Sequence, residues 1–349
     1  MSGPASLSPE ICARIVQAIP ARRGSNELAI LCRTCKAFQR EAEVKLYSVL
    51  NFSDAARVHD PRQRVLAREF WLGVQNALKQ MHNLNILTMY DNTLANSWIF
   101  DSPHIKFQLH ELALRFNWDA PLVRFIKSQS KLQRLQIFDY LDESCYLPLA
   151  PGSLPALRIF EGTLMVGLQM FSSPLTHLQI TFDPETQSPL PELSPRLWSV
   201  QKTLRSLSLL DITEDVVGDV LDLIASTCPD LVHLGLIPLP PIQREDLHHA
   251  LMHMHSLRTI QLDIGAWQPV PTQSAQRALA AELRVFCPSL RVVIFWIGTT
   301  RFSAGMTRFR WHYVYPTAAN GNGNTGEGQW AHGVETHVYP QLDQTWSMV

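Results

Sequence analysis

The stretch Leu204-Arg205-Ser206-Leu207-Ser208-Leu209 has leucine at its first, fourth and sixth positions. In a strand the fourth and sixth residues share one face, because side chains alternate between faces. Leu207 and Leu209 are expected to point into a core, and so are Leu234 and Leu236 in a later copy. Burying each such side chain contributes roughly 1.5–3 kcal/mol. The pattern starts nine times, at Leu84, Leu109, Leu132, Leu154, Leu175, Leu204, Leu231, Leu257 and Leu290.

Helical signals lie between these strand patterns. Asp119 with Pro121, Thr213 and Ser274 are each followed by apolar residues at helical spacing, and such residues favour helix starts. One strand and one helix in roughly 20–29 residues is typical of leucine-rich repeats. Alternating strands and helices form a parallel sheet, and so short a period gives an open stack. The sequence therefore predicts an α/β fold with an open, irregular leucine-rich-repeat solenoid over residues 84–300.

Composition narrows the class of protein. Of 349 residues, 46% are hydrophobic and 17% are charged, as in a folded globular protein. The 30 basic and 31 acidic side chains nearly cancel, so no nucleic-acid or membrane partner is expected. Residues 1–15 lack the features of a signal peptide, and the longest apolar run, Val292 to Ile297, is too short to span a bilayer. The six scattered cysteines are expected to be reduced, which favours a cytoplasmic or nuclear location, and they are Cys12, Cys32, Cys35, Cys145, Cys228 and Cys287.

Residues 1–50 differ from the repeats. Ser8, Pro9 and Glu10 form a good helix start, because they supply a capping hydroxyl, a proline in the first turn and an acid near the positive helix end. Two further helices are expected, from residue 27 to about 35 and around residues 38–47. The sequence therefore predicts a three-helix module over 1–50, too small to bury more than a modest core. Residues 51–83 are expected to form a helical connector.

The C-terminal segment, 301–349, is expected to cap the solenoid. Phe309, Trp311, Tyr313 and Tyr315 alternate with polar residues, which predicts a strand. Residues 317–333 are rich in Gly and Asn, which predicts a flexible loop, and residues 336–339 are expected to return as a partner strand. Terminal repeats of a solenoid need such a cap to cover their open end.

Residues 7–50 resemble an F-box-like domain. Leu7, Pro9 and Glu10 match its opening motif, although Ser8 replaces the usual first proline. The remaining matches are Ile15, Ile19-Pro20, Leu28, Leu31, Cys35-Lys36, Phe38 and Leu46-Tyr47. Followed by irregular repeats with Cys-Pro before two strand leucines, this module resembles the F-box/leucine-rich-repeat proteins, particularly the fungal type. The resemblance covers about residues 7–300.

The resemblance implies a substrate-recognition subunit of an SCF-type ubiquitin ligase. In that family the N-terminal helices bind the Skp adaptor of a cullin ligase, and the repeats select the client protein. The expected adaptor-binding residues are Leu7, Pro9, Ile11, Ile15, Leu28 and Leu31. The alternative for each is that it only fills the core of the helical module.

One column of the predicted strands suggests a client surface. The seventh position of each repeat is expected to face outward, and aromatic residues and arginine are enriched at binding hot spots. The expected client-binding residues are Tyr90, Arg115, Phe138, Phe160 and Trp296. The alternative is that loops, the C-terminal cap or sheet packing cover them.

Three motifs resemble sites for chemistry, but each has a simpler structural reading. Gly321-x-Gly323-x-x-Gly326 lacks the helix that a dinucleotide site needs and reads as a loop. Cys32-x-x-Cys35 lacks a second pair for zinc and reads as packing. His249 and His253 lack further ligands and read as a solvated helix face. We therefore expect no enzyme activity, cofactor or metal, and the alternative function is a leucine-rich-repeat interaction scaffold without a ligase.

Overall fold

In the computed structural model the chain divides into two compact units, residues 1–157 and 158–349. The boundary follows Leu157 and falls inside the range predicted as one solenoid. The structure describes residues 8–20, 25–52, 66–91, 93–138, 147–182, 190–242, 244–298, 306–314, 328–338 and 344–348.

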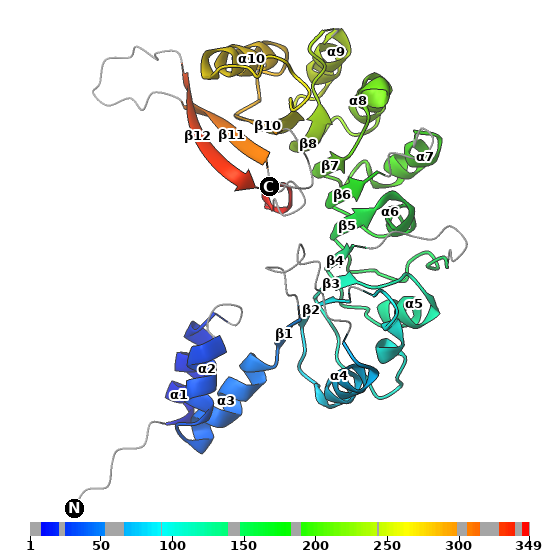
Figure 1. Cartoon of the computed structure of the whole chain (residues 1–349), viewed down its shortest axis with the longest axis vertical. Coiled ribbons are helices and arrows are strands. Elements are labelled where there is room, and N and C mark those ends of the chain that lie inside the picture. The colour runs from blue at the N-terminus through cyan, green and yellow to red at the C-terminus, as the bar shows by residue number, and fades with distance from the viewer. Residues whose placement is uncertain are drawn as a thin grey trace, which may run out of the picture. The chain divides into compact units, whose positions relative to one another are not determined.

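Unit 1 begins with three helices and continues as a parallel sheet (Figure 1). Its elements are α1 (Pro9–Ala18), α2 (Ser25–Cys32), α3 (Lys36–Leu46), β1 (Val49–Phe52), α4 (Arg68–Gln80), β2 (Ile86–Tyr90), η2 (Ser97–Phe100), β3 (Glu111–Arg115), α5 (Ala120–Lys127) and β4 (Arg134–Ile137). β1 pairs with β2, β2 with β3 and β3 with β4, all in parallel. The predicted connector does contain the helix α4, but β1 overlaps its start and extends the sheet.

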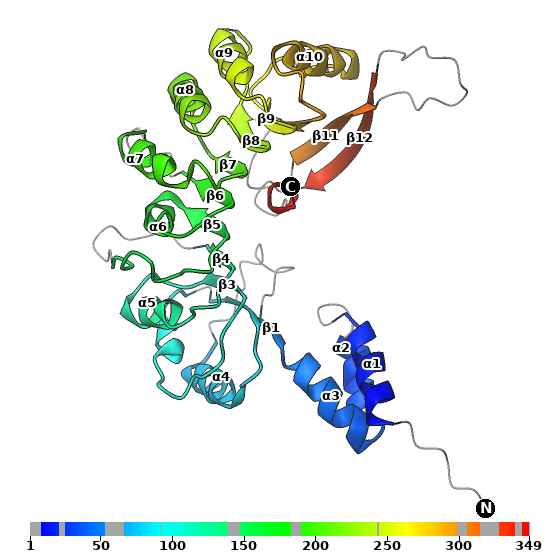
Figure 2. The ribbon, with the colours of Figure 1, turned by 180° about the vertical axis from the view of Figure 1, so that it is seen from behind.

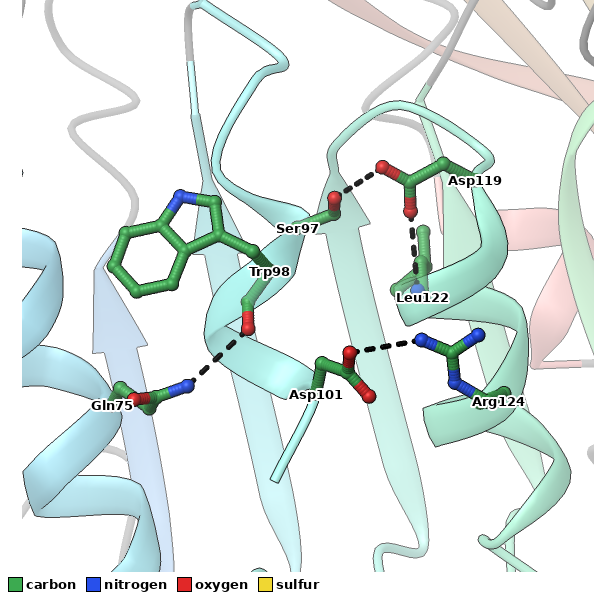
Figure 3. A network of polar contacts seen from close by, with 7 residues as sticks. All are labelled: Gln75, Ser97, Trp98, Asp101, Asp119, Leu122 and Arg124. Carbon is green, nitrogen blue, oxygen red and sulfur yellow. Dashed lines mark hydrogen bonds and ion pairs between the residues drawn. The ribbon is translucent and has the colours of Figure 1, made fainter. Parts of the chain in front are cut away.

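The predicted caps begin α1 and α5. Ser8 Oγ accepts a hydrogen bond from Ile11 N at 3.4 Å, and Asp119 Oδ1 accepts one from Leu122 N at 3.2 Å. Asp119 Oδ2 also accepts a hydrogen bond from the buried hydroxyl of Ser97. Figure 3 shows the two bonds of Asp119, to Leu122 and to Ser97. Each cap satisfies a backbone N–H that has no partner within its own helix.

The polar contacts of Figure 3 join α4, η2 and α5 on the helical side of unit 1. Gln75 Nε2 on α4 donates to the carbonyl of Trp98 at 3.3 Å. Arg124 Nη2 on α5 pairs with Asp101 Oδ2 at 2.9 Å, but both side chains are about half exposed. An exposed ion pair contributes little to stability, so the Asp119 cap is the stronger tie.

Asp119→Ala is expected to lower the free energy of unfolding by about 1–2 kcal/mol, because the cap of α5 and the acceptor of Ser97 are lost together. Asp119→Asn is the matched control, since asparagine caps helices about as well as aspartate. Urea unfolding of both variants checks this. Equal losses in the two variants would contradict a capping role.

Unit 2 contains six parallel strands followed by an antiparallel hairpin (Figure 2). Its elements are β5 (Ile159–Thr163), α6 (Leu164–Met170), β6 (His177–Thr181), α7 (Leu190–Val200), β7 (Ser206–Leu210), η4 (Glu214–Val216), α8 (Val217–Thr227), β8 (His233–Pro238), α9 (Glu245–His253), β9 (Thr259–Asp263), α10 (Gln273–Phe286), β10 (Val292–Ile297), β11 (Met306–Val314), β12 (Gln329–Val338) and η6 (Thr345–Ser347). Helices α6 to α10 cover one face of these strands (Figures 1 and 2).

The leucine columns of unit 2 form its core. Leu207 and Leu209 are fully buried, and they pair in register with Leu178 and Ile180 of β6. This confirms the predicted inward face of the strand. The helix after β9 starts at Gln273 with Thr272 as its cap, because Thr272 Oγ1 accepts from Ala275 N at 3.3 Å, so the predicted start at Ser274 was late. The predicted cap at Thr213 is wrong, because Thr213 precedes the short helix η4 and makes no side-chain cap bond, and α8 begins at Val217.

The predicted start of one repeat at Leu154 is wrong. β5 pairs with β6 so that Phe160 lies opposite Leu178, which places the repeat start at Leu157. In this register the sixth position is Gly162, opposite Ile180. Because glycine has no side chain, the pattern that starts at Leu157 lacks an apolar residue at its sixth position. The pattern that starts at Leu154 has apolar residues at all three positions, so the sequence favoured it.

A bulge in β8 corrects a second inward position. The pairing of β8 with β9 shifts between Leu234 and Ile237, and Leu236 has a φ of 59°, in the left-handed region. Ile237 therefore lies opposite Leu262 in the inward column. Leu236, which was expected there, packs instead in a cluster with Leu210, Ile294, Trp296 and Met306.

The C-terminal hairpin extends the sheet beyond β10, as expected of a cap. β11 pairs antiparallel with β10, and β12 pairs antiparallel with β11. β12 begins at Gln329, so residues 329–333 are strand and not the predicted loop. Tyr315 and the rest of that loop, with the Gly321–Gly326 motif, lie outside the described residues.

Candidate functional site

Helix α1 has apolar side chains on two faces. Cys12 and Val16 are buried in the core of the three-helix module, which also contains Leu28, Phe38 and Ala42. Ile11 and Ile15 lie on another face, and they are 46% and 39% exposed. Residues four apart are neighbours on a helix surface, so these two isoleucines form one apolar strip, called here the α1 face.

The six predicted adaptor-binding residues therefore differ in whether the structure exposes them. Ile11 and Ile15 are on the surface, whereas Leu28 is fully buried, so its expected contact with a partner is wrong. Leu31 is partly buried against the same core. Pro9 opens α1, but its side chain and the whole of Leu7 lie outside the described residues.

A second surface lies on the sheet of unit 1. It contains the last residues of β2 and β3, Tyr90 and Arg115, and the residue after β4, Phe138. All three side chains are partly exposed, as predicted. The rings of Tyr90 and Phe138 meet edge to face with centroids 5.7 Å apart. Since β3 lies between their strands, and strands are spaced about 4.8 Å apart, the two rings lean toward each other across β3. These three residues are called here the unit 1 patch.

Phe160 is fully buried, so its predicted place on a client surface is wrong. The corrected register of β5 puts its ring in the inward column beside Leu178. A Cβ added to Gly167 of α6 would lie 3.3 Å from its Cε1. Phe160 is therefore part of the packing between strand and helix.

Trp296 is also fully buried and cannot contact a client in this structure. It does occupy the predicted outward column, but the C-terminal hairpin covers it. Arg308 of β11 pairs opposite Trp296, and its guanidinium carbon lies 5.6 Å from the ring centroid. Met306 packs in the same apolar cluster.

A chain of side-chain hydrogen bonds crosses this outward face from β7 to β10. Trp296 Nε1 donates to Gln261 Oε1 at 2.7 Å, Gln261 Nε2 lies 3.0 Å from His233 Nε2, and His233 Nδ1 lies 2.9 Å from Ser206 Oγ. An indole N–H can only donate, so the amide NH2 of Gln261 must donate to His233 Nε2. In this arrangement His233 Nε2 accepts a hydrogen bond, and its Nδ1 faces Ser206 Oγ.

The chain's own C-terminus covers the same face of unit 2. η6 lies against β6, β7 and β8, on the side of the strands away from the helices (Figures 1 and 2). Trp346 is only 1% exposed. Its Nε1, Gln179 Oε1 and Ser208 Oγ have no hydrogen-bond partner within the described part of the chain. Among the described residues, the outward face of unit 2 is thus closed, whereas Tyr90, Arg115 and Phe138 of unit 1 are partly exposed.

The described residues offer no assembled metal centre, since no three His, Cys, Asp or Glu side chains gather there. His253 Nδ1 lies 2.9 Å from the carbonyl of His249, within one helix. The described cysteines are all free thiols, and burial raises the pKa of Cys228 to about 12. A thiol held protonated in this way is a poor nucleophile.

A pocket of about 580 Å³, which no sequence motif predicted, lies beside the strand starts of unit 2. Arg205, Arg258 and Arg291 line it. Leu-Arg opens several repeats, but arginine at an exposed position is common, so this pattern alone does not predict a site.

Within the described residues, no helix combines the length and apolar character that a membrane crossing requires. Comparison with protein-family models gave no match, and neither did comparison with curated proteins. Among solved structures, the chain is similar to the leucine-rich repeat-containing protein LegL7 from Legionella pneumophila. The identity is 15%, the match covers 71% of this chain and 82% of that one, and the TM-score is 0.44. The chain's own strand register and buried leucine columns define its leucine-rich-repeat architecture.

Proposed function

We propose that the chain is a non-catalytic, protein-binding subunit of an SCF-type ubiquitin ligase. Helices α1 to α3 dock a Skp adaptor, and the repeats hold a client protein. The observation that supports this most is the α1 face, because a helix that already fills its own core exposes Ile11 and Ile15 as well. An exposed apolar strip on a small module favours a protein partner.

The proposed mechanism is proximity. A client held on the repeats and an adaptor held on the helices share one molecule, so the client's effective concentration near the ligase rises without bond chemistry in this chain. The expected partners are the adaptor, its cullin ligase and a client protein. The free thiols agree with the proposed cytoplasmic or nuclear location.

The client surface in this proposal is the unit 1 patch. Tyr90 and Phe138 supply half-buried rings with little freedom to lose, and Arg115 supplies a charged hydrogen-bond donor beside them. Such residues carry much of the binding energy in many interfaces. The closed outward face of unit 2 supports this placement, since Trp296 is buried there and η6 lies against β6, β7 and β8.

Replacing Ile11 and Ile15 together by aspartate is expected to weaken adaptor binding by at least about tenfold, because two charges would enter an apolar contact. The matched control is Gln17→Asp, which adds a charge at an exposed position of the same helix. Binding of purified Skp adaptor to the full chain and each variant, measured by calorimetry, checks this.

Two results would contradict adaptor docking. One is failure of the unaltered chain to bind the adaptor, which would leave the scaffold without a ligase as the function. The other is equal binding by the unaltered chain and the double variant. Far-ultraviolet circular dichroism shows whether α1 to α3 remain folded in each variant.

A further inference from the structure

The pocket of about 580 Å³ in unit 2 lies where successive strands begin. Besides the three arginines, its lining contains two serines, one histidine and two small apolar residues. The full lining is Arg205, Val232, His255, Ser256, Arg258, Pro288, Ser289 and Arg291. It is called here the arginine pocket, and none of its lining residues belongs to the α1 face or the unit 1 patch.

The backbone sets the arginines side by side. Val232 N donates to the carbonyl of Arg205, Arg258 N to that of Val232, and Arg291 N to that of Arg258, each at 2.8 Å. These residues hold the same place in consecutive coils, each directly after the first leucine of a repeat. Arg258 and Arg291 are therefore on neighbouring coils, about 4.8 Å apart at the backbone.

The serines and the histidine come from the turns that precede the strands. His255 and Ser256 follow α9, and Ser289 follows α10. Ser289 Oγ donates to the carbonyl of Leu257 at 2.8 Å, which fixes its oxygen at the wall of the pocket. Arg205 Nη1 lies 3.4 Å from the carbonyl of Asp230, a weak contact for a guanidinium.

The charge of the lining points to an anion. Three arginines are among the residues that line one hollow, and no Asp or Glu is among the described residues that line it. Like charges on neighbouring strands repel one another. A bound anion with several acceptor oxygens relieves this repulsion and can take two parallel hydrogen bonds from a guanidinium.

We propose that the arginine pocket binds a phosphate monoester through Arg205, Arg258 and Arg291. A phosphate group supplies about two negative charges and three acceptor oxygens, and arginine forks match this geometry better than lysine does. A pocket of about 580 Å³ is larger than a phosphate group, so it also holds part of the molecule that carries the group. This site goes beyond adaptor docking and does not depend on it.

Four probes test the site: glycerol 3-phosphate, glycerol, a ten-residue peptide with one phosphoserine, and the same peptide without phosphate. Calorimetry at fixed ionic strength compares them on the full chain. The expected result is that at least one phosphorylated probe binds and that its unphosphorylated partner does not. Arg258→Gln and Arg291→Gln are each expected to weaken that binding about tenfold or more, through loss of charge-assisted hydrogen bonds.

Arg158→Gln is the matched control. Arg158 also follows the first leucine of its repeat and is exposed, but it does not line the pocket, and its Nη1 donates to the carbonyl of Pro174 at 3.1 Å. This variant is expected to bind like the unaltered chain. Arg258→Lys keeps the charge and loses the fork, so it is expected to bind more weakly than the unaltered chain even where Arg258→Gln fails to fold.

Three results would overturn the site: no binding of either phosphorylated probe, equal binding of a phosphorylated probe and its unphosphorylated partner, or an equal loss in Arg158→Gln and Arg258→Gln. Either source of the phosphate supports it. Peptide binding more than about tenfold tighter than glycerol 3-phosphate assigns the phosphate to a modified protein, and comparable affinities assign it to a small ester. Adaptor binding is measured separately, so the two proposals can fail independently.

Discussion

Phe160→Ala is expected to lower the free energy of unfolding by about 3–5 kcal/mol, whereas Phe138→Ala is expected to lower it by about 1 kcal/mol or less. Both residues were expected on one exposed column, but the structure separates them. Phe160 is fully buried beside Leu178, with α6 packed against it, so its loss leaves a cavity. Phe138 is partly exposed and loses mainly its edge contact with Tyr90.

Urea unfolding followed by tryptophan fluorescence measures this difference. Hydrogen exchange of β5 and β6 shows whether the loss is confined to the strands around Phe160. Similar losses for the two variants would contradict the corrected register of β5. If Phe160→Ala alone lowers the free energy of unfolding only slightly, the ring of Phe160 lies on the surface and not in the core.

Trp296→Ala is expected to lower the free energy of unfolding by about 3–5 kcal/mol as well, since a fully buried indole leaves a large cavity. The substitution also removes the donor that Gln261 Oε1 accepts at 2.7 Å. The hydrogen-bond chain to His233 and Ser206 then loses the group that orients it.

Trp296→Phe is the matched control, because it removes the same donor and keeps most of the apolar volume. Its expected loss is about 1–3 kcal/mol, the penalty of an unsatisfied buried acceptor. Thermal and urea unfolding of both variants measure the two effects. A Trp296→Ala variant as stable as the unaltered chain would show that β11 does not cover this ring.

Local features of this fold could be predicted well. Leu207 and Leu209 were assigned to the core because strand alternation is a property of the backbone itself. Ser8 and Asp119 were assigned as helix caps because a cap acts within three residues of sequence. Ile11 and Ile15 were expected to contact a partner because residues 7–50 resemble an F-box-like domain, and the structure shows both side chains exposed on α1.

Register was less secure. The residues Leu154 to Gly162 contain two overlapping apolar patterns, and only the hydrogen bonds to β6 select the one that starts at Leu157. At Leu236 a left-handed backbone conformation reverses the side chain, and the packing around Trp296 supports it. Neither feature has a local signal strong enough to predict it.

The sequence by itself determined the repeating strands and helices and the caps of α1 and α5, because these depend on residues a few positions apart. Only the tertiary structure decided which strand faces are open. Trp346 and the hairpin β11–β12 close the outer face of unit 2 from positions far along the chain, whereas the patch on unit 1 stays partly exposed. Arg205 and Arg291 also line one pocket only in the folded chain. They are far apart in the sequence, but successive coils stack, so only the spacing between strands separates one coil from the next.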